Sequence, residues 1–369
     1  MIRLTLRYEW QPRPGRALAL DPALFRALHA LHETGSLAAA ARRLALSYRH
    51  VWGLVGKWGK VFGKPLVAMQ RGRGAALTEF GEQLLWAEQL VRARLTPELE
   101  SVRQEIERVL HEAAPAAGRL AVCASHDLAL AALRDRLAQR DGLKLDLRFQ
   151  GSIESLAALS SGACRFAGFH VAEGLEQSAA RLFRRHLDRR RHALVGVATR
   201  TQGLMAARGN PKRIESLADL LRRDVRIVNR QRGSGSRIEF DELLRGAGID
   251  TAAIRGYETE EFTHLAVAAT VAGGGADAGY GIRAAAAQYG LHYVPLLTER
   301  YYLAAERRAL RDDRGAQLLA ILRSEVFREL LAALPGYGDA ISGRIFEVNE
   351  VLGAAGTGNA RSGERARPR

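Results

Sequence analysis

The pattern of apolar and polar positions divides the chain into regions with different predicted structure. Over residues 20–95 apolar residues recur every three or four positions, which predicts amphipathic helices. From residue 119 short apolar runs alternate with alanine-rich stretches, which is typical of strands and helices in an α/β fold. Residues 353–369 offer almost nothing to bury and are predicted to form a disordered tail.

The first helical region predicts a helix-turn-helix. Asp21 with Pro22, then Ser36, then Ser47 provide N-caps for successive helices. The helix after Ser47 has one apolar and one basic face, and the first residues of such a helix lie against base edges in the major groove. A guanidinium pairs bidentately with guanine, so Arg49 is the best single candidate for base reading. The candidate DNA contacts on the helices are Ser36, Ser47, Tyr48, Arg49, His50 and Lys57.

Residues 65–78, PLVAMQRGRGAALT, predict a strand, a basic glycine-rich turn and a second strand. This is the hairpin of a winged helix, with Arg71 and Arg73 at its tip as further candidate contacts to phosphate or the minor groove. The alternative for the preceding helices is an ordinary helical hairpin with a solvated basic face. The hairpin that follows them favours the DNA-binding interpretation.

The segments ETGSLAAAARRLALSYRHVWGLV, FGKPLV and RGRGAALTEFGEQLL resemble the winged-helix domain of ModE-type molybdate-dependent transcriptional regulators, a relative of the LysR-type head. The resemblance covers residues 20–95, and helix, wing and following helix match in order. It implies a transcriptional regulator whose partner is double-stranded operator DNA.

Thr78 is predicted to cap a helix through Leu95, and Thr96 with Pro97 to begin another. Their apolar stripes have the spacing of a helix that packs on a partner helix. Helix-turn-helix heads usually read paired half-sites, so we expect a homodimer or a higher homo-oligomer. The alternative is that the stripes pack on their own domain. Residues 111–118, HEAAPAAG, predict a linker.

In the α/β region, strands are predicted at residues 120–124, 143–149, 166–170, 193–199, 225–229, 278–280 and 293–295. Several run into small polar residues that open a helix, as in CASHDLALAAL, FQGSIESLAAL and NRQRGSGSRIEFDELL. Helix N-termini favour anions, and open α/β sheets bind ligands at the carboxyl ends of their strands, although a single serine is more often just a cap. The candidate ligand-binding residues are Ser125, Ser152, Arg230, Gly233, Ser234, Gly235, Ser236, Arg237 and Tyr280.

This half of the chain resembles the periplasmic-binding-protein-like domain related to molybdate- and tungstate-binding proteins. The segments that carry the resemblance are RLAVCASHDLAL, FQGSIESLAALSSGACRFAGFH, RTQGLM, NRQRGSGSR and EFTHLAVAATVAGGGADAGYGI. The resemblance implies two lobes that close on a small oxyanion, molybdate or tungstate, as effector. The small β-barrel sensory domain of ModE is absent from the sequence, so formate, sulfate or an organic acid remains an alternative ligand.

Together these patterns predict a multi-domain protein, an α-rich winged helix-turn-helix head followed by a two-lobed α/β periplasmic-binding-protein-like domain. The expected DNA-binding domain is residues 1–77, the dimerisation helices and linker are 78–118, and the ligand-sensing domain is 119–352. Within that domain lobe 1 is expected at 119–200 and 295–352, and lobe 2 at 201–294.

Composition and motifs narrow the function further. A net charge of +15 and a pI of about 10.5 favour an anionic partner, either nucleic acid or an anionic membrane surface. The sequence contains no apolar run of about 18 residues and no signal peptide, so we expect a soluble cytoplasmic protein without membrane contact. Cys123 and Cys164 lack metal-ligand spacing and are expected to be reduced and buried.

No nucleophile elbow, Walker loop or dinucleotide fingerprint is present, so we predict no enzymatic activity, no catalytic residue, no cofactor and no metal site. The competing hypothesis is an enzyme acting on a pterin, with the head as autoregulator. The basic run AARLFRRHLDRRRH, residues 179–192, is interpreted as a solvated helix face, with a secondary DNA contact as the alternative.

Overall fold

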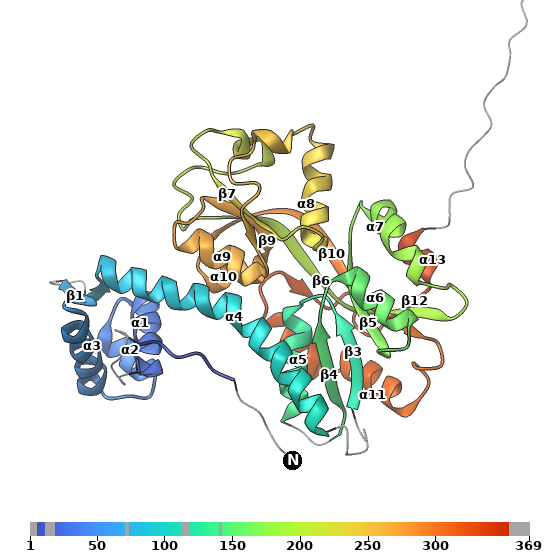
Figure 1. Cartoon of the computed structure of the whole chain (residues 1–369), viewed down its shortest axis with the longest axis horizontal. Coiled ribbons are helices and arrows are strands. Elements are labelled where there is room, and N and C mark those ends of the chain that lie inside the picture. The colour runs from blue at the N-terminus through green and yellow to red at the C-terminus, as the bar shows by residue number, and fades with distance from the viewer. Residues whose placement is uncertain (1–5, 12–18, 71–73, 112–118, 140–141, 354–369) are drawn as a thin grey trace, which may run out of the picture. The chain divides into compact units, whose positions relative to one another are not determined.

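The computed structural model describes residues 6–11, 19–70, 74–111, 119–139 and 142–353. The chain divides into two compact units, each assembled from separate stretches of sequence. Unit 1 contains Met1–Pro115, Gly203–Arg232 and Ser236–Pro295, and unit 2 contains Ala116–Gln202, Gly233–Gly235 and Leu296–Arg369. Figure 1 shows the helices and strands and labels many of them.

The head of unit 1 is a winged helix-turn-helix, as predicted. It consists of helices α1 (Pro22–Thr34), α2 (Leu37–Arg43) and α3 (Tyr48–Phe62) and the antiparallel hairpin of β1 (Val67–Gln70) and β2 (Gly74–Leu77). The predicted caps form: Asp21 accepts from the N–H of Ala23, Ser36 from Ala39 and Ser47 from His50. The buried faces of the helices form one apolar core around Trp58, which is 1% exposed.

The next element is α4 (Glu79–His111), a single helix of 33 residues. The predicted interruption at Thr96 and Pro97 is therefore wrong. Proline removes one backbone hydrogen bond, a loss that a helix of this length tolerates. Of the linker predicted at residues 111–118, His111 belongs to α4 and residues 112–118 lie outside the described residues, as do residues 354–369 of the predicted tail. Residues 6–11 form no helix or strand.

Unit 2 is built on a sheet with strand order β4-β3-β5-β10-β6. Its strands are β3 (Arg119–Ala124), β4 (Lys144–Phe149), β5 (Phe166–Ala172), part of β6 (His192–Ala206), part of β10 (His292–Glu306), β11 (Tyr337–Gly338) and β12 (Ile345–Phe346). Its helices are α5 (Leu128–Ala138), α6 (Ser152–Ser160), α7 (Glu176–Phe183), η1 (Arg184–His186), α11 (Asp313–Leu322), α12 (Glu325–Ala332) and α13 (Val348–Leu352). Two apolar clusters pack on this sheet, one around Phe166 and Tyr301, the other around Phe169 and Tyr302.

The remaining part of unit 1 continues with strand order β6-β9-β7-β8. Its elements are η2 (Leu217–Leu221), β7 (Ile227–Arg230), α8 (Gly235–Gly246), η3 (Thr251–Ala253), β8 (Glu260–Glu261), α9 (His264–Ala272), β9 (Ala278–Ile282) and α10 (Arg283–Gln288). The strands β6 and β10 each have 15 residues and pass from one unit to the other, at Gln202 to Gly203 and at Pro295 to Leu296.

The predicted strands at 193–199 and 293–295 were therefore correct in place but much too short. Arg200 and Glu299 interrupt the apolar pattern in the sequence, although the strands continue through them. The domain limits expected from the sequence stay a prediction. Among the described residues, no helix is long and apolar enough to cross a membrane.

Candidate DNA interface and ligand-binding site

The basic face of α3 is exposed, and its apolar face is buried in the head. Ser47, Tyr48, Arg49, His50 and Lys57 are all exposed, and Ser36 is half-buried at the start of α2. This exposed face carries no acidic residue. It can therefore approach a polyanion without charge repulsion. Arg71 and Arg73, predicted at the tip of the wing, lie outside the described residues.

Trp52 is a feature of this face that the sequence interpretation missed. It is 46% exposed and stacks on Tyr48, which is 47% exposed, with ring centroids 6.4 Å apart and planes at 6°. The sequence did contain a signal for Trp52, because it lies four residues after Tyr48 and residues at this spacing share a helix face. Exposed aromatic pairs of this kind add stacking and apolar contact area to a surface that otherwise offers charge.

In unit 2, loops at the carboxyl ends of the parallel strands β3 and β4 bring candidate ligand residues to one edge. The N–H of Gln150, after β4, donates to the carbonyl of Ala124 at the end of β3 (2.9 Å). Ser125 follows β3, and Ser152 is the first residue of α6. The Ser152 hydroxyl is buried and has no hydrogen-bond partner among the described residues.

Ser125 also contacts His170, which no sequence signal had pointed to. The Ser125 Oγ lies 3.3 Å from His170 Nδ1 and 3.3 Å from the Tyr301 hydroxyl. Gly235 lies against the same ring, because a Cβ at this position would be 2.2 Å from His170 Nε2. Only glycine fits there. Gly235 of the predicted Gly-Ser-Gly-Ser loop and Ser125 thus both lie against the His170 ring.

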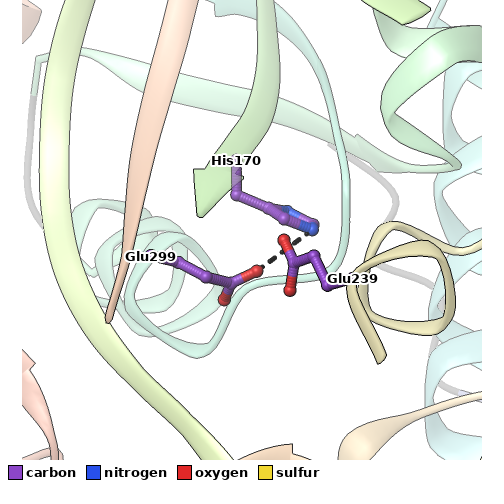
Figure 2. A group of neighbouring side chains, drawn as sticks. All are labelled: His170, Glu239 and Glu299. Carbon is purple, nitrogen blue, oxygen red and sulfur yellow. Dashed lines mark ion pairs between the residues drawn. The ribbon is translucent and has the colours of Figure 1, made fainter. Parts of the chain in front are cut away.

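Behind His170 lies a buried network of charged residues. Figure 2 shows the ion pair of His170 Nε2 with Glu299 Oε1, at 3.4 Å, and also labels Glu239 of α8, a residue of unit 1. The other carboxylate oxygen of Glu299 accepts from Arg200 Nε (2.6 Å), and Arg200 Nη1 donates to Asp127 Oδ2 (3.0 Å). Burial acts to lower the pKa of Arg200, but the two carboxylates outweigh it and raise this pKa well above its ordinary value.

In unit 1, the candidate residues Arg230, Ser236 and Arg237 lie around the start of α8. The Ser236 Oγ is 3.3 Å from His264 Nε2. Arg237 Nε donates to Asp241 Oδ1 (3.0 Å), and its guanidinium stacks over the Tyr257 ring at 4.2 Å. The charge of Arg237 is thus already compensated within unit 1. The remaining candidates, Tyr280 and Ser234, are respectively buried against Phe240 and half-buried in the loop.

A second set of contacts in unit 1 ties α4 to the loop that precedes α9. Arg94 of α4 forms two hydrogen bonds from Nε to the carboxylate of Glu261, at 3.0 and 3.2 Å, and Glu261 is 3% exposed. Thr263 Oγ1 donates to the carbonyl of Ala93 (3.3 Å), and Trp86 Nε1 donates to the carbonyl of Ala269 (2.8 Å). The hydrogen bond to Glu261 raises the pKa of Arg94 above its ordinary value.

The comparisons with known families agree with this architecture. Residues 22–82 match the family described as bacterial regulatory helix-turn-helix protein, lysR family, and residues 134–323 match the family described as PBP superfamily domain. The first match lies on the winged helix-turn-helix head, and the second lies on the part of the chain that carries the candidate ligand-binding residues. The chain belongs to the PBP superfamily, whose match covers more than half of its residues. This confirms the predicted fold class.

Two relatives are uncharacterized proteins. YvgK of Bacillus subtilis strain 168 is 34% identical over 203 residues, which are 54% of this chain and 64% of that protein. The chain therefore spans less than two thirds of that relative. A Clostridium pasteurianum protein encoded in the 5′ region of a 2Fe-2S ferredoxin gene is 38% identical over 109 residues, 29% of this chain and 96% of its own length.

Two solved structures are similar at lower identity. A hydrogen-peroxide-bound mutant of Corynebacterium glutamicum OxyR is 17% identical with a TM-score of 0.43, and covers 86% of this chain and 95% of its own. Full-length CbnR in complex with its target DNA is 18% identical with a TM-score of 0.38, and covers 84% of this chain and 98% of its own.

Proposed function

We propose that this regulator senses a small oxyanion, molybdate or tungstate, and that the anion changes its affinity for operator DNA. The observation that carries the proposal is the Ser152 hydroxyl, buried and without a partner among the described residues at the N-terminus of α6. A helix N-terminus offers free N–H groups and the positive end of the helix dipole. A buried hydroxyl without a hydrogen bond costs about 1 to 3 kcal/mol, which a bound acceptor would recover.

Ser125 and Gly235 support the same site. Ser125 lies at the carboxyl end of β3, next to the loop that leads into α6. Gly235 allows the backbone of the glycine–serine loop to approach closely, since a side chain there would collide with His170. Gly233 and Ser234, in the same loop as Gly235, remain part of the proposal. Arg230, Ser236, Arg237 and Tyr280 of unit 1 also remain proposed ligand-binding residues.

A second ligand class is favoured by one observation. The His126 and Phe149 rings lie 4.7 Å apart, directly after β3 and at the end of β4. Both side chains are half-buried, so they offer a partly apolar wall beside Ser125. A tetrahedral oxyanion needs only hydrogen-bond donors, whereas an organic acid also needs such a wall. The alternative effector is therefore an organic anion bound through its carboxylate.

The contacts of α4 supply a physical route from ligand to DNA. Ser236 contacts His264, the first residue of α9, and the neighbouring residues Thr263 and Glu261 are bonded to α4. The helix α4 begins directly after the wing of the head. A ligand that rearranges the Ser236 loop would thus also act on α4 and the head. The ligand can change the free energy of DNA binding only by as much as its own binding free energy differs between the two arrangements of the Ser236 loop.

The second half of α4 is the proposed dimer interface, with a second copy of the chain as its partner. Val102 is 46% exposed and Ile106 38% exposed, and with Leu95 and Leu99 they follow a repeat of four, three and four residues. This is the spacing of a coiled-coil seam. A dimer places two heads on paired half-sites, and we propose that it acts in the cytoplasm, where its operator lies.

The first test is the change in melting temperature of the full chain with molybdate, tungstate, sulfate, phosphate and formate. A ligand at 100 times its dissociation constant adds about 2.7 kcal/mol to the free energy of unfolding. A shift with molybdate and tungstate but not sulfate supports the proposal. Gly235→Ala should abolish that shift, while Gly246→Ala, in the same helix with open space around it, should keep it. No shift with any anion contradicts the oxyanion proposal.

The route through α4 has its own test. Arg94→Met removes the bonds to Glu261. Arg92→Met serves as control, because Arg92 pairs with Glu88 of the same helix and hydrogen-bonds Tyr289 but, in the described part of the chain, forms no bond to Glu261. Arg94→Met should leave the anion-induced melting shift unchanged but abolish the effect of the anion on DNA binding. A DNA response equal to that of the control variant would contradict the route without affecting the ligand.

A further inference from the structure

A basic surface of unit 2 has no part in the sites described above. Two segments, RRHLDRRR at residues 184–191 and ERRALR at residues 306–311, are distant in sequence but adjacent in the fold. The N–H of Arg307 donates to the carbonyl of Arg191 (2.8 Å), and its guanidinium donates to the carbonyls of Arg189 and Arg190 (3.2 Å each). The exposed members form what we name the arginine surface: Arg185, Arg189, Arg190, Arg191, Arg308 and Arg311.

Few carboxylates compensate this surface. Arg191 and Arg308 share Glu306, which accepts from Arg191 Nη2 at 2.7 Å. Glu347 pairs with Arg307. Asp188, in the same segment, accepts from the backbone N–H groups of Arg190 and Arg191. Within the described part of the chain, four exposed members form no side-chain ion pair with a carboxylate, namely Arg185, Arg189, Arg190 and Arg311. Net positive charge therefore remains free on the surface.

Neighbouring histidines respond to this charge. Burial and the adjacent Arg185 both lower the pKa of His186. Burial and the adjacent Arg191 likewise lower the pKa of His192. A positive potential disfavours the protonated form of a histidine, so these directions agree with the excess of arginine.

The arginine surface is separate from the proposed ligand site. His192 begins β6 next to this surface, and Arg200 of the buried network lies eight residues further along the same strand. At about 3.3 Å per residue, this separates the two by roughly 26 Å. An effector bound beside His170 would thus not contact the arginine surface.

We propose that the arginine surface binds the phosphate backbone of duplex DNA, as a second contact that is independent of base sequence. A guanidinium presents a planar fork of donors that fits phosphate oxygens, and the unpaired arginines are free to use it. Once the head is bound, flanking phosphates are present at high effective concentration, so even a weak second contact adds affinity. The net charge of the chain, +15, favours a polyanionic partner.

The test uses the full chain and a fluorescent mixed-sequence duplex of about 60 base pairs, because sequence-independent binding needs no operator. The affinity is measured between about 50 and 200 mM salt for wild type and for the variant Arg189→Ala, Arg190→Ala, Arg311→Ala. The matched control replaces Arg208, Arg223 and Arg255, exposed arginines of unit 1, and removes the same charge.

Each lost phosphate contact should reduce the magnitude of the slope of log affinity against log salt by about 0.9. The slope of the triple variant of the arginine surface should therefore be smaller by about 2 to 3, and the slope of the control variant should be almost unchanged. Equal slopes for wild type and the patch variant would overturn the proposal. Equal losses for the two variants would overturn it too, since general charge and not this surface would then be responsible. A loss seen only with single-stranded RNA as probe would reassign the surface to RNA.

Discussion

Arg200→Met is the most informative single change in unit 2. Arg200 is 1% exposed, and the carboxylates of Asp127 and Glu299 that it bonds are both 0% exposed. Methionine has a similar length and fills most of the space, but it leaves two buried negative charges without their cation. Breaking a buried ion pair by removing one partner costs about 3 to 5 kcal/mol, and we expect a loss of that size in the free energy of unfolding.

The assay is urea denaturation followed by far-UV circular dichroism. All four tryptophans, Trp10, Trp52, Trp58 and Trp86, belong to unit 1, so tryptophan fluorescence reports that unit separately. The matched control is Arg300→Met in β10, because Arg300 pairs with Glu173 at an exposed position. That pair should be worth less than about 1 kcal/mol.

A second variant distinguishes two causes of the stability loss in Arg200→Met, uncompensated buried charge and lost packing. In the triple variant Arg200→Met, Asp127→Asn, Glu299→Gln, the uncompensated charges are gone while the side-chain shapes are nearly retained. We expect this variant to regain much of the stability that Arg200→Met loses. If it is no more stable than Arg200→Met, lost packing and not buried charge explains the effect, and our account of the network is wrong.

Three further changes test other parts of the structure. Arg49→Ala should weaken operator binding by about 1 to 3 kcal/mol and relax base preference in a competition assay, and unchanged binding would mean that α3 is not the reading helix. Gly273→Ala should cost about 1 to 3 kcal/mol in thermal unfolding, because its Cβ would lie 1.5 Å from Trp86 Nε1, whereas Gly246→Ala should not. Burial acts to raise the pKa of Asp312, but the Gly315 N–H and Arg165 outweigh it and hold this pKa below its ordinary value. Asp312→Ala should therefore cost about 1 kcal/mol at pH 7 as a lost N-cap, and the difference from wild type should shrink as the pH falls below about 4; a difference that persists in acid would contradict this.

The head could be predicted in detail because its determinants are local. Ser36 and Ser47 cap their helices within three residues of chain, and the spacing of Val51, Leu54, Val55 and Trp58 alone specifies the buried face of α3. The same locality explains the error at Pro97. A proline lowers the propensity of a few residues for helix, whereas the length of α4 also reflects tertiary contacts, such as those of Trp86 and Arg94 with distant residues.

The buried charges of unit 2 could not be predicted, since their partners are far apart in the sequence. Asp127, Arg200 and Glu299 belong to three separate elements, and each alone reads as a surface residue or a helix cap. His170 has no sequence signal either, because it lies within an otherwise apolar strand. The serine loops were a better signal, since strand-to-helix junctions with small polar residues recur along the chain. The other residues of such a site, such as His170, are distant in the sequence and are brought close only by the fold.

The passage of β10 between the units also affects how the chain is made. In the sheet of unit 2, β5 pairs with β10 through the partners Ala172 and Glu299. A ribosome that adds about 5 to 20 residues per second needs roughly 6 to 25 seconds to cover the interval between these strands. During that time the edge of β5 that later pairs with β10, apolar except for His170, has no strand to pair with. The nascent chain is therefore most dependent on chaperones after its winged helix-turn-helix head has already folded, and products that end before β10 should aggregate or be degraded.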